Sequence, residues 1–316
     1  MKLHKLGPKK ATAQRFSTTE DSQRFAKMKA VWGASAISGT LDDIIISGKG
    51  MWVLEKTLLE LFVLTIIIHT VDTLAYSVRL NAVKSGQVAL SFSLFNMFVL
   101  LARTANLFQG PLVGSIIGIS IAKGLNPVSD MRTVIFASTA GTILGIILIP
   151  TFLRIFEAAV RRLELTGSVP SLVVEALQAN NIKRILRSAT RPSKTMLEKL
   201  RFREIPKRLL ILNALVTGIY TVGVLAAYYS ALLVPEQARL AAASSSGVIN
   251  GMASIILTLF IDPKSAIITD QALRGKRPYG DVKALVVLLI GTKLIGTLLG
   301  QVLFLPATEV IASFYR

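Results

Sequence analysis

Residues 61–80 read LFVLTIIIHTVDTLAYSVRL, an apolar stretch that runs directly into His69, Asp72, Tyr76 and Arg79. The apolar part belongs to a block of about 20 residues, the length that a helix needs to cross a hydrocarbon layer of ~30 Å at 1.5 Å per residue. Five further blocks follow, and none alternates as a barrel strand does. The sequence therefore predicts an all-α integral membrane protein, a bundle of about six transmembrane helices.

The composition agrees with a membrane protein and argues against an enzyme. Of the 316 residues, 52% are hydrophobic and 17% are charged, less charge than a soluble domain of this size carries. The absence of cysteine excludes a disulfide framework and a thiolate metal site, and two histidines argue against an imidazole-rich one. The sequence shows neither a nucleophile with its base nor a glycine-rich phosphate loop. We therefore expect no catalytic residue, no metal and no cofactor.

The chain divides into a polar, basic N-terminal extension, residues 1–50, and a six-helix transmembrane domain, residues 51–316. Prolines near the ends of the apolar blocks are expected to delimit the spans, because proline interrupts a helix. These prolines are Pro111, Pro127, Pro206, Pro235, Pro263 and Pro306. The predicted spans are about 57–78, 88–108, 134–156, 209–233, 240–261 and 284–305.

The formal net charge of +18 is distributed unevenly over the two sides of this plan. In the loops and the C-terminus after residue 56, twenty lysine and arginine residues fall on one side and four on the other. The positive-inside rule then places a long basic loop, residues 157–207, in the cytoplasm and both ends of the domain outside. We expect the excess positive charge to face anionic membrane lipids rather than nucleic acid.

Two segments outside the spans leave alternatives open. With this orientation the extension must cross the membrane or lie along its interface, unless Met51 is the functional start. Residues 170–192 form a basic amphipathic pattern, with apolar residues on one helix side and Lys183, Arg184 and Arg187 on the other. Such a helix either lies on an anionic leaflet or packs on the bundle in the cytoplasm.

A polar stripe follows the first span. Thr65, His69, Asp72, Tyr76 and Arg79 succeed one another at spacings of four, three, four and three residues, which places them on one helix face within roughly 80° of arc. A charge at mid-bilayer costs at least a few kcal/mol, so this face must look into the bundle or into water. The alternative to a functional face is an interhelical hydrogen-bond clamp.

The second and sixth spans add polar groups. Arg103 stays charged under all accessible conditions and needs an anion, either Asp72 or a phosphate of a ligand. Lys293 lies well inside the sixth span; it either snorkels to an interface or faces inward, and we favour the inward position. Thr297 and Gln301 continue its helix face. The second span also carries Asn96, two helix turns before Arg103 on the same face, followed by Asn106 and Gln109.

These groups contain a surplus of positive charge. Three cations, Arg79, Arg103 and Lys293, accompany one carboxylate, Asp72. A proton or sodium pathway would be rich in carboxylates, whereas a cation surplus within the bilayer implies an anionic cargo or an anionic headgroup.

Glycine pairs four residues apart indicate close helix packing and permit a homodimer. They are Gly141/Gly145, Gly247/Gly251 and Gly296/Gly300. The small, polar run at 243–254, with Asn250 as its strong hydrogen-bonding group, either lines a cavity or forms a tight helix interface.

The stretches HTVDTLAYSVRLNAVKSG (69–86) and SFSLFNMFVLLARTANLFQGPLVG (91–114) resemble the Amj family of bacterial lipid II flippases. The resemblance is specific over roughly residues 65–115, and the extension 1–50 has no counterpart in it. The residues that carry it are His69, Asp72, Thr73, Tyr76, Ser77, Arg79, Ser93, Leu94, Phe95, Asn96, Arg103, Asn106, Gln109, Pro111 and Leu112.

The resemblance implies that the protein moves lipid II, the undecaprenyl-pyrophosphate-linked peptidoglycan precursor, from the inner to the outer leaflet of the bacterial cytoplasmic membrane. Its residues then acquire expected roles. Arg79, Arg103 and Lys293 would pair with the diphosphate. Asp72 would hold an arginine in the absence of cargo, and His69 would tune that pair with pH. Tyr76 would belong to the same charge-partner group, while Asn96, Asn106 and Gln109 would hydrogen-bond sugars or amides of the headgroup.

Two other functions stay open on the residues alone. The protein could be a secondary transporter of a small organic anion, which would show saturable uptake of a soluble substrate. It could also be a non-transporting membrane scaffold whose polar stripes are packing clamps.

Overall fold

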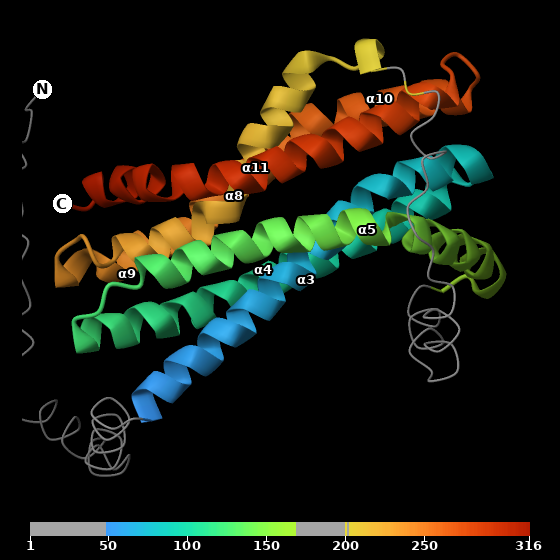
Figure 1. The fold of residues 1–316 in the computed structure, drawn as a ribbon. Coiled ribbons are helices and arrows are strands. Elements are labelled where there is room, and N and C mark those ends of the chain that lie inside the picture. Colours follow the sequence, from blue (N-terminus) through green and yellow to red (C-terminus); the bar gives the residue numbers. More distant parts are fainter. Residues whose placement is uncertain (1–48, 169–199, 201) are drawn as a thin grey trace, which may run out of the picture. The chain divides into compact units, whose positions relative to one another are not determined.

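Six long apolar helical segments dominate the computed structural model, which describes residues 49–168, 200 and 202–316 (Figure 1). The described residues contain helices and no strand, and all six segments are long and apolar enough to cross a membrane, so the predicted all-α membrane fold is confirmed. The helices are α3 (Lys49–Ser85), α4 (Val88–Lys123), α5 (Val128–Thr166), α8 (Lys207–Ser230), α9 (Arg239–Ile256), the π-helix η4 (Leu257–Ile261), α10 (Asp262–Leu273) and α11 (Tyr279–Ser313); η2 (Phe202–Glu204) and η3 (Glu236–Ala238) are short 3₁₀ turns.

Apart from α8, the helical segments are longer than the predicted spans, and only some of the prolines delimit them as expected. Pro127, Pro206 and Pro235 directly precede α5, α8 and η3. Pro111 lies inside α4 and Pro306 inside α11. Pro263 follows the first residue of α10, within a helical segment that continues from Glu236 to Leu273. Membrane helices tolerate proline where neighbouring groups satisfy the freed carbonyl, so proline alone is a poor boundary marker here. The membrane limits of each span stay a prediction.

The chain reverses direction at each connection, which gives the bundle two ends (Figure 1). We call one the basic end; it carries the α3–α4 turn at Gly86 and the α10–α11 turn at Gly275, two glycines with positive φ. The opposite end carries the α4–α5 turn and the C-terminus of α11. That the basic end faces the cytoplasm stays a prediction. The extension before residue 49 and the predicted amphipathic helix at 170–192 lie outside the described residues.

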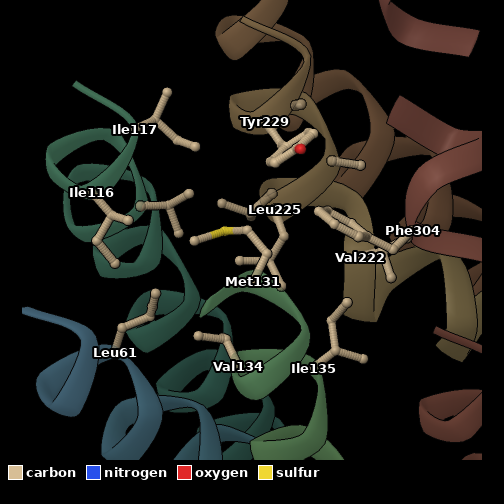
Figure 2. Close-up of a cluster of buried hydrophobic side chains, with 14 of the residues drawn as sticks. Leu61, Ile116, Ile117, Met131, Val134, Ile135, Val222, Leu225, Tyr229 and Phe304 are labelled. Carbon is tan, nitrogen blue, oxygen red and sulfur yellow. The ribbon is translucent and has the colours of Figure 1, made fainter. Parts of the chain in front are cut away.

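Apolar packing differs between the two ends. At the opposite end a single cluster unites α3, α4, α5, α8 and α11 (Figure 2). At the basic end the buried apolar side chains form two clusters, one around α8, α9, η4, α10 and α11 and another around α3, α4 and α5; Tyr76, Leu80 and Val83 of α3 also pack against the first. The opposite end is therefore closed by continuous core. The residues labelled in Figure 2 are Leu61, Ile116, Ile117, Met131, Val134, Ile135, Val222, Leu225, Tyr229 and Phe304.

Two of the three glycine pairs bring helices into close contact within the chain. Gly141 and Gly145 of α5 lie against the α3 backbone and Thr73. Gly296 of α11 lies against α8, where an added Cβ would approach the Ala214 carbonyl oxygen to 2.6 Å. These contacts fix α3 on α5 and α8 on α11.

The third pair, Gly247 and Gly251 of α9, meets no described atom within 4 Å of an added Cβ. Nearby, Asn250 lies against Gly223 of α8, so this part of the small run is a helix interface. Asn250 does not line the polar cavity described below. The homodimer stays a prediction.

Gly296→Ala and Gly247→Ala form a matched test of close packing. The helix-propensity gain is the same for both, whereas only Gly296→Ala inserts a methyl into occupied space. Overpacking of this kind costs typically ~1–3 kcal/mol. We expect a lower melting temperature of the detergent-solubilised protein for Gly296→Ala and an unchanged or higher one for Gly247→Ala. Equal melting temperatures of the two variants would contradict the packing described here.

Candidate functional site

A polar cavity of about 90 Å³ lies among α3, α4, α8, α9, η4, α10 and α11. It gathers six of the nine site residues predicted from sequence: His69, Asp72, Tyr76, Arg79, Arg103 and Lys293. The other lining residues are Ala75, Phe95, Val99, Val216, Thr217, Tyr220, Ala253, Ser254, Leu257 and Asp262.

The polar stripe of α3 faces into the bundle, as its spacing predicted. Thr65, His69 and Arg79 are buried, and the side chain of Asp72 keeps 27% of its surface exposed. His69 Nδ1 is buried and has no hydrogen-bond partner among the described residues. From His69 to Arg79 the stripe is therefore one wall of the cavity and not a lipid-facing surface.

Lys293 of α11 points inward, as we favoured. Its side chain is 4% exposed, and its Nζ lies 3.7 Å from Asp72 Oδ2. The same ammonium donates to the His69 carbonyl oxygen at 3.4 Å and lies 5.8 Å from the centre of the Tyr76 ring. Gln301 does not continue this face into the cavity; it exchanges hydrogen bonds with Arg132 of α5. We had expected Asp72 to hold an arginine, but it is paired with Lys293.

Arg79 is paired with Asp262, a residue that the sequence reasoning missed. Arg79 Nη2 donates to Asp262 Oδ1 at 3.0 Å, and the arginine side chain is 3% exposed. The guanidinium carbon also lies 5.8 Å from the Tyr76 ring centre and 5.2 Å from that of Phe95. The predicted fifth span ended at residue 261, which would have left Asp262 in a loop. Because η4 continues the helix, Asp262 faces the cavity instead.

The charge count at the cavity changes accordingly. Three cations, Arg79, Arg103 and Lys293, face two carboxylates, Asp72 and Asp262, so the described lining carries an excess of one positive charge. The sequence had suggested a single carboxylate. The surplus of positive charge persists but is smaller.

Arg103 is the cation that supplies this surplus. It lines the cavity but remains exposed, and no described residue forms a hydrogen bond, ion pair or ring contact with it. It lies fifteen residues after Val88, the first residue of α4, or about 22 Å along the helix axis. Because its guanidinium cannot be deprotonated in a protein, the cavity presents a permanent charge that awaits an anion.

Three predicted site residues on α4 do not line the cavity. The face of α4 that does consists of Phe95, Val99 and Arg103, four residues apart. Asn96 lies seven residues before Arg103, within about 20° of it around the helix, and both side chains are exposed, but Asn96 does not line the cavity. The remaining two are Asn106, which is partly buried, and Gln109, which is buried and donates to Thr65 Oγ1 at 2.9 Å. Their predicted contacts with a headgroup stay a prediction.

Asn213 of α8 is a second polar residue that sequence reasoning missed. It is fully buried; its Oδ1 accepts from the Tyr76 hydroxyl at 3.0 Å, and its Nδ2 donates to the Leu289 carbonyl oxygen at 2.9 Å. Nδ2 also donates to Thr292 Oγ1 at 2.9 Å. An asparagine within the apolar run RLLILNALV was the available signal. Asn213 holds Tyr76 in position against α8 and α11.

The Lys293–Asp72 pair can be tested by a double-mutant cycle. Asp72→Asn leaves a buried ammonium without its counter-ion, whereas Asp72→Asn combined with Lys293→Met removes both charges. Loss of one partner of a buried pair costs up to ~3–5 kcal/mol, and the partial exposure of Asp72 reduces that figure. We expect the single variant to melt at a lower temperature than the double variant. Additive effects of the two substitutions would show that the charges do not interact.

Comparison with known proteins adds an independent line of evidence. The family model described as "Amj: Alternate to MurJ" matches residues 64–315. A protein of Bacillus subtilis (strain 168), named "Lipid II flippase Amj", is 38% identical over 264 residues, which cover 83% of this chain and 98% of the relative. No solved structure matches the chain significantly. The resemblance over residues 65–115 thus extends across nearly the whole transmembrane domain, and the chain belongs to the Amj family.

Proposed function

We propose that the protein is a lipid II flippase of the bacterial cytoplasmic membrane. It moves the undecaprenyl-pyrophosphate-linked peptidoglycan precursor from the inner to the outer leaflet and is a transporter rather than an enzyme. Family membership and the named function of the Bacillus subtilis relative support this proposal. The six apolar helical segments supply the multi-pass membrane domain that it needs.

The observation that carries the proposal is Arg103. A permanent charge at this depth costs at least a few kcal/mol unless an anion accompanies it, and no described residue pairs with this one. A lipid-linked diphosphate brings such an anion along the bilayer, while its polyprenyl tail stays in hydrocarbon. An arginine can hold a phosphate through two parallel N–H···O bonds. Arg103 is therefore the residue that first engages the diphosphate.

Lys293 and Asp72 have a different role in the proposal. They already neutralise each other at 3.7 Å, deeper in the bundle than the exposed Arg103. A diphosphate that reaches Lys293 competes with Asp72 for the ammonium. His69, whose backbone oxygen accepts from the same lysine, lies beside this exchange. We therefore propose that the diphosphate binds Arg103 first and then reaches Lys293, deeper in the bundle.

The state described here cannot enclose the headgroup. A cavity of about 90 Å³ has room for a few water molecules, not for a disaccharide with a peptide. The opposite end is closed by one continuous apolar cluster, whereas the basic end has two separate clusters. Transport requires movement between helices, and the basic end has the weaker apolar closure. We propose that anionic lipids contact the exposed cations of that end, among them Lys84 and Lys264.

Arg103→Ala tests the proposal in a strain in which no other lipid II flippase operates. We expect the wild-type protein to support growth and Arg103→Ala to abolish it at equal expression, because the diphosphate loses its first cation. Thr104→Ala is the matched control, since Thr104 is the exposed neighbour that does not line the cavity. Full growth with Arg103→Ala would refute the role of this residue.

Arg103→Lys separates transport from a purely structural role. Lysine keeps the charge but loses the bidentate geometry, so we expect intermediate growth and an unchanged melting temperature. A scaffold would show lower stability without a transport defect. Saturable uptake of a soluble organic anion into proteoliposomes, without any effect on lipid II, would instead favour the small-anion transporter.

A further inference from the structure

Only part of the hydrogen-bonding capacity of the Arg79 guanidinium is satisfied. Nη2 is hydrogen-bonded to Asp262, whereas Nε and Nη1 are buried and have no hydrogen-bond partner among the described residues. The rings of Tyr76 and Phe95 contact its faces but accept no in-plane hydrogen bond. A guanidinium offers five N–H groups in a plane that fits a phosphate. Arg79 therefore has donors for an anion with more oxygen atoms than Asp262 supplies to it.

The surroundings of Asp262 differ from those of a permanently buried counter-ion. Its side chain keeps 35% of its surface exposed, although Arg79 is almost fully buried. It directly follows the π-helix η4 and precedes Pro263, which lacks a backbone N–H. Such π-helical turns in α-helices often mark functional sites. The acidic residue thus lies at an irregular point of its helix and is only partly covered by protein.

The Arg79–Asp262 pair also joins the two apolar clusters of the basic end. Phe95, which stacks on Arg79, packs on the cluster of α3, α4 and α5. Ile261, next to Asp262, belongs to the cluster of α8, α9, η4, α10 and α11. Among the described side chains, no other hydrogen bond or ion pair links α10 to α3. Release of Asp262 therefore removes the polar connection between these helices.

We propose that Asp262 occupies on Arg79 the place of a cargo phosphate, and that the phosphate of a polyprenyl diphosphate displaces it. This inference rests on the proposed function. A buried guanidinium without an anion is strongly destabilising, so Arg79 must exchange one anion for another and cannot simply release Asp262. The exchange removes the polar link between α10 and α3 at the basic end and leaves only the apolar packing of α3 on the cluster that contains α10, with η4 as the hinge. When Asp262 returns, it expels the phosphate, which keeps binding weak enough for release.

Binding of farnesyl diphosphate to the full-length protein in detergent tests the exchange. Asp262→Asn removes the competing charge while it keeps the side-chain shape. We expect this variant to bind farnesyl diphosphate roughly tenfold tighter than the wild type, since one charged competitor for Arg79 is lost. We also expect the ligand to raise its melting temperature more than that of the wild type, and its lipid II transport to fall. Asp270→Asn is the matched control, because Asp270 lies on α10, pairs with Arg274 and does not line the cavity.

Unchanged or weaker binding by Asp262→Asn would overturn the exchange. A variant in which the two charged residues are swapped, Arg79→Asp with Asp262→Arg, is a second test. We expect it to restore the melting temperature but not farnesyl diphosphate binding; restored binding and transport would show that the pair is purely structural. If Asp262→Asn does not bind farnesyl diphosphate more tightly while the wild-type protein transports lipid II, only this inference is contradicted. If the wild-type protein does not transport lipid II, the proposed function is contradicted.

Discussion

A guanidinium within a membrane bundle cannot lose its proton, and it therefore requires an anion. Arg79 and Arg103 satisfy this constraint in two different ways. Arg79 is buried and holds Asp262, while Arg103 is exposed at the cavity without a described partner. In our proposal the arginine that already holds an anion closes the basic end, and the arginine without a described partner meets the cargo.

The fold holds these charges by unequal packing. Small residues draw α3 onto α5 and α8 onto α11, and a single apolar cluster closes the opposite end (Figure 2). The segments α4 and α9–η4–α10 are the least buried of the six, and they carry Arg103 and Asp262 (Figure 1). The charged groups that exchange partners in our account thus lie on the helices with the fewest packing constraints. Lys293 and Asn213, by contrast, lie on the well-buried helices α11 and α8.

The sequence predicted the fold class and the inward stripe because both depend on local spacing. A four-three repeat fixes a helix face whatever surrounds it, so Asp72 and Arg79 were correctly oriented. Which charges pair is a tertiary property, and here the sequence reasoning was wrong about Asp72 and missed Asp262. The fifth helical segment continues through the π-helix η4 into α10, beyond its apolar run, which local hydropathy does not register. Asn96 shares a side of α4 with Arg103, as its spacing predicted, yet it does not line the cavity, because which α4 side chains reach the cavity depends on the neighbouring helices.

The central claim is that the protein exposes lipid II to the outer leaflet and that Arg103 is required. The most direct measurement is the accessibility of lipid II to an external probe in cells in which this protein is the sole flippase. Our account predicts accessible lipid II with the wild-type protein and loss of accessibility with Arg103→Ala at equal expression. Inaccessible lipid II with the wild-type protein, or undiminished accessibility with Arg103→Ala, would contradict it.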